Sequence, residues 1–252
     1  MSEELDIYMN RHKLKIYMPT NGLYLIILIL VPLLTSNNYA FALTITGSQQ
    51  NDNFVGTTSS DSMLGLNGND NISALEGDDT AQGNEGDDYI IMGAGNDYVL
   101  GGAGSDSIQG KAGNDYISGG PGRDSIQGEE GNDQVFGNQQ EDTLDGGQGN
   151  DTLIAGPGND NLVGGPGYDN LVGGLENDIL RGDDGNDQLE GGPGADTLTG
   201  GDGADSFDCG LGVDRVLDFN EGQGDTKLDN CDQRKLLLCD LFVGINIQIP
   251  YC

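Results

Sequence analysis

The nonapeptide Gly101-Gly102-Ala103-Gly104-Ser105-Asp106-Ser107-Ile108-Gln109 decides how this chain folds, because its pattern recurs along most of the sequence. From Asp52 to Asp214 an aspartate stands at every ninth position, which makes 19 copies without a gap. We number the repeat so that this aspartate is position 6. Position 8 is then apolar in all 19 copies, and positions 1 and 4 are each glycine in 15 of them. A fixed period of this kind is the signature of a repeat architecture.

Each copy combines a turn with a short strand. Glycines three residues apart permit positive φ and a tight turn, and the segment of about three residues around position 8 predicts a strand. Two copies close a coil of 18 residues, and the 19 copies stack as about nine and a half coils of parallel strands. The sequence therefore predicts an all-β fold, a parallel β-roll over residues 43–220, with the position-8 side chains as its core and residues 221–252 as a C-terminal cap.

The charge of the chain restricts its partners. The chain has 252 residues, with 10 Lys and Arg against 42 Asp and Glu, a net charge of -32 and a pI near 4.1. Nucleic acids and acidic membranes are bound by basic surfaces, so neither is an expected partner. Cations are the expected partners instead. The only histidine is His12, so a chain that loses its N-terminal segment has no Ser-His or Cys-His catalytic pair.

The position-6 aspartates predict two metal-binding edges. Even-numbered aspartates fall on one edge of the stack and odd-numbered ones on the other, about 5 Å apart along each edge. At that spacing two carboxylates repel each other by roughly 1 to 3 kcal/mol, so the metal-free stack should not be stable. A hard cation with oxygen ligands reverses this repulsion, and flexible carbonyl cages suit Ca²⁺ better than Mg²⁺. We expect Ca²⁺ ligation by Asp70, Asp79, Asp88, Asp97, Asp106, Asp115, Asp124, Asp133, Asp151, Asp160, Asp169, Asp187, Asp196, Asp205 and Asp214. We expect weaker sites at Asp52, Asp61, Asp142 and Asp178, where Gln50, Ser59, Gln140 and Glu176 replace the position-4 glycine.

The nonapeptide resembles the calcium-binding repeat of the repeats-in-toxin (RTX) family, which forms a parallel β-roll in secreted bacterial proteins. The resemblance covers about residues 47–220. It implies that each position-6 aspartate binds Ca²⁺ together with turn carbonyls, and that the repeats fold when the ion binds. The turn carbonyls expected to take part lie near Gly93, Gly95, Gly102, Gly104, Gly120, Gly122, Gly147, Gly149, Gly156, Gly158, Gly165, Gly167, Gly192 and Gly194.

The number of ions follows from adjacent same-edge pairs of aspartates. Nine pairs on the even edge and eight on the odd edge give at most 17 sites. Eleven of these pairs keep the position-4 glycine in both copies. A load of 11 to 17 Ca²⁺ brings a charge of +22 to +34, which is comparable to the net charge of -32.

The two ends of the chain indicate export. Residues 1–42 contain basic residues, an apolar run from Leu23 to Leu34 and the small-residue pattern Ala40-Phe41-Ala42, as in a cleaved signal peptide. The alternative is a membrane anchor, which needs roughly 20 apolar residues, whereas the run from Leu23 to Leu34 has 12. The cysteines Cys209, Cys231, Cys239 and Cys252 all lie near the C-terminus, and an even number suggests two disulfides. Three connectivities are open, and we favour Cys209 with Cys231 and Cys239 with Cys252 because each closes a local loop.

These features favour a secreted, non-enzymatic calcium-binding β-roll with a structural or surface role. The alternatives are an adhesin or glycan-binding module and, less well supported, a polysaccharide-acting enzyme with paired carboxylates. An outward file of Leu100, Phe136, Ile154 and Val172 on the odd-numbered series, with Ser118 between them, suggests a contact with a cell surface, a glycan or a second copy. The same residues also suit short strands because of their high β-propensity.

Overall fold

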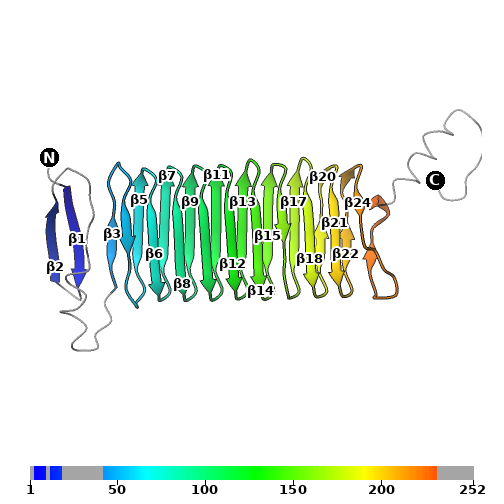
Figure 1. Cartoon of the computed structure of the whole chain (residues 1–252), viewed down its shortest axis with the longest axis horizontal. Coiled ribbons are helices and arrows are strands. Elements are labelled where there is room, and N and C mark those ends of the chain that lie inside the picture. The colour runs from blue at the N-terminus through cyan, green and yellow to red at the C-terminus, as the bar shows by residue number, and fades with distance from the viewer. Residues whose placement is uncertain (1–2, 10–11, 19–41, 232–252) are drawn as a thin grey trace, which may run out of the picture.

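The chain winds into a parallel β-roll, which appears in Figure 1 as one continuous row of stacked strands. The computed structural model describes residues 3–9, 12–18 and 42–231. Within the roll every strand pair is parallel, and almost every register joins residues 18 apart, such as Ile108 with Ile90 and Ile126. The predicted all-β fold with two repeats per coil is confirmed.

Two sheets form the opposite walls of the roll. Ten strands form the sheet that we call the even sheet, because its strands follow even-numbered position-6 aspartates: β4 (Asn53–Val55), β6 (Asn71–Glu76), β8 (Tyr89–Ala94), β10 (Ser107–Ala112), β12 (Ser125–Glu130), β14 (Thr143–Gln148), β16 (Asn161–Val163), β18 (Ile179–Asp184), β21 (Thr197–Asp202) and β24 (Arg215–Val216). Eleven strands form the odd sheet: β3 (Thr44–Thr46), β5 (Ser62–Asn67), β7 (Thr80–Glu85), β9 (Tyr98–Ala103), β11 (Tyr116–Pro121), β13 (Gln134–Gln139), β15 (Thr152–Pro157), β17 (Asn170–Leu175), β19 (Gln188–Glu190), β22 (Ser206–Asp208) and β25 (Thr226–Lys227). A small parallel pair joins β20 (Pro193–Gly194) and β23 (Leu211–Gly212).

The strands are longer than the three residues predicted. Most contain six residues and run from position 7 through position 3 of the next copy. Pairing continues past the glycine at position 1, as in the register of Lys111 with Glu129 and Ala112 with Glu130. Within the repeats positive φ is confined to positions 2 and 4, and Gly102 and Gly104 are examples with φ of 119° and 142°.

The core is a narrow file between the two sheets. Almost every position-8 side chain is buried, from Phe54 to Phe207, as predicted. Position 1 is buried as well, and the four copies without glycine there add Ala74, Met92, Ala155 and Cys209 to the core. The position-8 residues are thus not the whole core, because the extended backbone turns position 1 inward together with position 8.

The C-terminal end of the roll is closed by residues beyond the last full repeat. Phe219 packs edge-on against the core residue Phe207 at 6.3 Å, and Lys227 Nζ lies 4.7 Å from the Phe219 ring centre. A disulfide joins Cys209 to Cys231, at the 3₁₀ helix η3 (Asp229–Cys231). This pair is the favoured one, whereas Cys239 and Cys252 lie outside the described residues. Strand β25 pairs with β22, so the odd sheet extends past residue 220 into the segment expected to form the cap.

The N-terminal segment holds two further strands. β1 (Glu3–Met9) and β2 (His12–Met18) form an antiparallel hairpin in the segment where we expected the basic part of a signal peptide. The apolar run 23–34 lies outside the described residues. Among the residues that the structure describes, no helix is long and apolar enough to cross a membrane.

Candidate metal centre

The position-6 aspartates form a buried ladder along each edge of the roll. Each one directly precedes a strand, so even-numbered aspartates line one edge and odd-numbered ones the other. All 19 are buried, with Asp106 only 2% exposed. The backbone N–H of Asp88 donates to Oδ1 of Asp106 at 2.8 Å. The same bond links all 17 consecutive same-edge pairs, from Asp52 with Asp70 to Asp196 with Asp214.

The second carboxylate oxygen has a different environment. In 17 of these aspartates Oδ2 is buried and accepts no hydrogen bond. Buried polar atoms in folded proteins are nearly always hydrogen-bonded, so a repeated exception requires a physical reason. The 17 aspartates are Asp70, Asp79, Asp88, Asp97, Asp106, Asp115, Asp124, Asp133, Asp142, Asp151, Asp160, Asp169, Asp178, Asp187, Asp196, Asp205 and Asp214.

A backbone carbonyl lies close to this unpaired oxygen. A Cβ added at Gly146, position 1 of its copy, would lie 2.5 Å from Oδ2 of Asp151 and 2.8 Å from the carbonyl oxygen of Gly164. Two acceptor oxygens from adjacent coils therefore border one small volume. Gly146 does not have positive φ, so glycine is needed here for space and not for backbone conformation. The position-1 carbonyl was not predicted from the sequence, although the glycine preference at position 1 was its signal.

The carbonyls expected to be ligands come from positions 2 and 4. In the structure these carbonyls point along the stack, toward the residue at the same repeat position in the next coil. A Cβ at Gly165 would lie 2.0 Å from the Gly147 oxygen, and a Cβ at Gly104 would lie 2.1 Å from the Gly86 oxygen. These carbonyls line the same turns as the aspartates, whereas the oxygen immediately beside each carboxylate belongs to position 1.

Burial makes the ladder carboxylates difficult to ionise in the absence of a cation. Desolvation raises the pKa of Asp79, Asp106 and Asp115 to about 7, and repulsion from ladder neighbours acts in the same direction. For Asp151 the same causes raise the pKa to about 6, while the hydrogen bond from the Asp133 N–H opposes the shift. A positive charge beside Oδ2 would remove the penalty on the ionised form.

The N-terminal ends of both ladders and the C-terminal end of the odd ladder differ from the middle. Oδ2 of Asp52 accepts the N–H of Ser48 at 2.6 Å, and Oδ2 of Asp61 accepts the N–H of Thr57 at 2.5 Å. Both aspartates are among those expected to form weaker sites. At the other end Asp225, which was not predicted as a site residue, continues the odd ladder. Its Oδ1 accepts the Asp205 N–H at 3.1 Å after a spacing of 20 residues.

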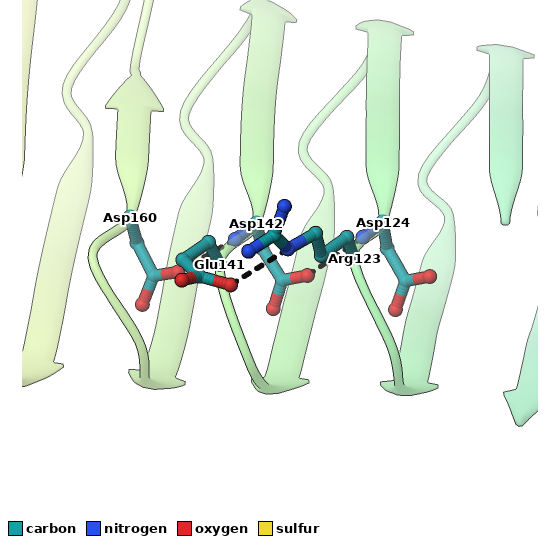
Figure 2. A network of polar contacts seen from close by, with 5 residues as sticks. All are labelled: Arg123, Asp124, Glu141, Asp142 and Asp160. Carbon is teal, nitrogen blue, oxygen red and sulfur yellow. Dashed lines mark hydrogen bonds and ion pairs between the residues drawn. The ribbon is translucent and has the colours of Figure 1, made fainter. Parts of the chain in front are cut away.

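The other two copies expected to be weaker keep the geometry of the ladder. Gln140 and Glu176 take φ of 71° and 76°, so the turns form without glycine. Oδ2 of Asp142 and of Asp178 is unpaired, as in the copies that have glycine. Next to Asp142, the Arg123 side chain reaches along the edge to Glu141 on the adjacent coil, with Nε to Oε2 at 2.8 Å (Figure 2).

A second ladder runs along each edge at position 5. Oδ1 of Asn114 accepts the N–H of Asn132 at 2.7 Å, and Oδ1 of Asn132 accepts the N–H of Asn150 at 2.7 Å. Here the side chain accepts the N–H of the following coil, whereas in the aspartate ladder the side chain accepts the N–H of the preceding coil. Asn, Asp or Ser at position 5 of most copies was the sequence signal for this ladder, which we did not predict.

The donor set fits a hard cation. Among the described residues no group of three or more His, Cys, Asp or Glu side chains is placed to hold a metal ion. The available ligands are instead a pair of carboxylates from adjacent coils and backbone carbonyls, all of them oxygen. Ca²⁺ takes six to eight oxygen ligands of these kinds in flexible geometry. Unpaired buried carboxylate oxygens beside carbonyl oxygens therefore match calcium better than zinc or copper, which prefer nitrogen and sulfur ligands.

The architecture defines the class of protein: a parallel β-roll with a ladder of buried aspartates along each edge. The sequence profile of the RTX calcium-binding nonapeptide repeat, which spans four copies, matches residues 46–81, 64–99, 73–108, 93–126, 100–135, 118–153, 136–171, 154–189 and 181–216. Together these matches cover 171 of the 252 residues, from 46 to 216. The chain belongs to the RTX calcium-binding nonapeptide repeat family. A comparison with curated proteins found no match.

Proposed function

We propose that this protein is a secreted structural β-roll that folds when Ca²⁺ binds along both of its edges. The observation that carries the proposal is the row of 17 buried Oδ2 atoms that accept no hydrogen bond. Among the described residues no donor reaches these oxygens, and the adjacent atoms include further acceptors. A cation at each coil-to-coil step would convert repulsion between carboxylates into attraction to a shared ion.

Each ion would be held between two consecutive coils of one edge. For the step from Asp133 to Asp151 the ligands would be the two carboxylates, the Gly164 carbonyl beside Oδ2 of Asp151 and carbonyls of the turns at positions 2 and 4. The bound ion supplies charge neutralisation and a bridge between coils. Seventeen same-edge steps would take 17 ions and bring a charge of +34 against the net charge of -32. The weaker copies lower this number toward 11.

Calcium ligation also accounts for the carboxylate pairs without enzymatic activity. Every buried aspartate of the roll is a ladder member or, in the case of Asp225, its extension. A general acid and base need two carboxyl groups in different environments. The ladder instead repeats one environment from coil to coil, so we infer a structural role and no catalysis.

Export would make calcium a switch between compartments. We propose that residues 1–42 are a signal peptide, that residues 43–220 form the roll, and that residues 221–252 form its cap. The metal-free chain, with its repelling ladders and narrow core, would remain unfolded in the calcium-poor cytosol. Outside the cell, where calcium is abundant, even weak sites would fill, and their binding free energy would fold the chain.

Circular dichroism of residues 43–252 during a calcium titration tests the proposal, with magnesium and chelator as matched conditions. We expect a cooperative gain of β signal with calcium alone. Folding that is complete in chelator would show that the core and the disulfide are sufficient, and it would leave the unpaired carboxylate oxygens without a role in folding.

A further inference from the structure

The two outer faces of the roll differ in charge. Positions 7, 9 and 2 point outward from each strand. On the even sheet six of these residues are charged, and they include the ion pairs Lys111–Glu129 and Arg181–Asp183. On the odd sheet none of these residues is charged across the eight strands from β3 to β17, and the only charged residue in those strands is the exposed Glu85 at the end of β7. We call this outer surface of β3 to β17 the neutral face. An outer surface without charge at these positions is unusual in a chain with a net charge of -32.

Apolar and aromatic side chains occupy the centre of the neutral face. Phe136 on β13 is in register with Ile154 on β15, which is in register with Val172 on β17. Tyr98 and Tyr116 stack with ring centres 4.9 Å apart, and Tyr116 lies 5.1 Å from Phe136. These side chains are already packed against one another, so ordering them in a complex costs little conformational entropy. Tyr98 nevertheless remains 41% exposed.

The size of the neutral face matches a standard protein interface. Eight strands about 4.8 Å apart, with about five residues at 3.3 Å along each, cover roughly 38 by 17 Å, or about 650 Å². Two such faces together would bury about 1,300 Å², within the range of about 1,200 to 2,000 Å² for specific interfaces. Glycines at position 2 of β9, β11, β15 and β17 keep the surface low and flat on one side of the aromatic cluster.

The distribution of charge favours a second copy of the chain as the partner that binds the neutral face. Two chains of the same large negative charge repel each other through most surfaces, whereas the neutral face brings no like charges together. A twofold axis in the plane of contact makes a flat uncharged face its own complement. A neutral glycan needs several polar groups, whereas at the centre the side chains of Leu100, Phe136, Ile154 and Val172 are hydrocarbon and hydroxyl groups come from Ser118, Tyr98 and Tyr116.

We propose that the folded roll forms a homodimer through the neutral face. The inference rests on the proposed calcium-dependent folding only in that the odd sheet must be formed. Circular dichroism therefore checks folding first, and sedimentation velocity then checks association, so the two proposals fail by different measurements.

The test uses protein produced from the full sequence and loaded with calcium. We expect sedimentation velocity at micromolar concentration to give twice the mass of the chain. Ile154→Glu places two like charges in the interface and should raise the dissociation constant at least about 100-fold. Val163→Glu is the matched control, because Val163 is a partly exposed β-branched residue at the same repeat position on β16 of the even sheet. It should leave the dimer intact.

A second variant distinguishes weaker association from loss of folding. Phe136→Gln introduces the residue that Gln109 and Gln127 already provide at position 9 of the even sheet, so the strand tolerates it. It should weaken the dimer at least tenfold with an unchanged β signal. Folded wild-type protein that stays monomeric at 100 µM would overturn the proposal, and so would a dimer weakened equally by Ile154→Glu and Val163→Glu. Monomeric protein retained on neutral dextran would reassign the face to a glycan.

Discussion

Replacing Asp151 by asparagine should change stability in opposite directions with and without calcium. The amide keeps the shape of the side chain and the Oδ1 atom that accepts the Asp133 N–H at 2.8 Å. It removes the negative charge and can place an NH₂ group beside the Gly164 carbonyl, where the carboxylate has an unpaired oxygen. The substitution therefore separates the role of the charge from the role of the shape.

The magnitudes follow from the ladder geometry. Asp151 lies between Asp133 and Asp169, each about 4.8 Å away along the edge. Without metal, removing both repulsions stabilises the folded chain by about 2 kcal/mol at the dielectric of water and about 7 kcal/mol at an effective dielectric of 20. With calcium at 100 times its dissociation constant, each site contributes about 2.7 kcal/mol. Loss of the two sites that share Asp151 then destabilises the protein by about 5 kcal/mol.

Three measurements test this prediction. Calorimetric titration should count two fewer calcium ions than in the wild type, and urea denaturation in calcium should show the loss of stability. In chelator, the variant should fold at a lower concentration of trimethylamine N-oxide, an osmolyte that favours compact states. Asp202→Asn, at an exposed carboxylate at the end of β21, is the control and should change none of these quantities appreciably. An unchanged calcium count would refute ligation by Asp151, and an unchanged osmolyte requirement would refute charge repulsion as the cause of unfolding.

Three further predictions concern protons, turns and the cap. In chelator, lowering the pH from 8 to 5 should increase the β signal, because burial raises the pKa of ladder carboxyls such as Asp70 and Asp79 to about 6 and 7. The folded state then binds more protons than the unfolded state, so stability rises as the pH falls through these values toward 3.8; a signal that only decreases would contradict this. Gln140→Gly and Glu176→Gly should each raise the free energy of unfolding in urea by about 1 kcal/mol by relieving left-handed backbone, and an equal gain from Gln139→Gly, in a strand, would contradict the reason. Reducing the disulfide of Cys209 with Cys231 should lower that free energy by about 3 kcal/mol, and a reductant without effect would show that the cap is held by packing alone.

The period of the sequence was sufficient to predict most of the fold. A spacing of nine places consecutive copies on opposite walls, so the separation of Asp106 from Asp115 onto two edges follows from counting alone. The apolar residue two positions after each aspartate faces the interior, because side chains of a strand point alternately inward and outward. Ile108 and Ile117 are therefore both completely buried. Each local preference agrees with the global arrangement, and such agreement makes a structure predictable from its sequence.

The structural features that were not predicted from the sequence depend on contacts between coils. Glycine at position 1 suggested a turn, but Gly146 is extended and leaves room for the Asp151 carboxylate. Asp225 was missed because an insertion of two residues breaks the ninefold count, although the chain still brings its carboxylate to the Asp205 N–H. Strand length was underestimated because pairing with the next coil continues through positions 2 and 3, as for Lys111 with Glu129 and Ala112 with Glu130. None of these contacts is visible within a single nonapeptide.

The ends of the odd ladder explain why only its interior would need metal. Asp61 accepts the N–H groups of Leu43 and Thr57, and Asp225 accepts those of Asp205 and Asn220. Both oxygens of each terminal carboxylate are thus satisfied by the protein, whereas every carboxylate between them keeps one oxygen without a donor. A terminal coil has a neighbouring coil on one side only and cannot form a shared ion site on the other. Backbone donors close the ladder at both ends, and each interior ion site depends on the coil next to it, so calcium binding and folding should propagate together along the roll.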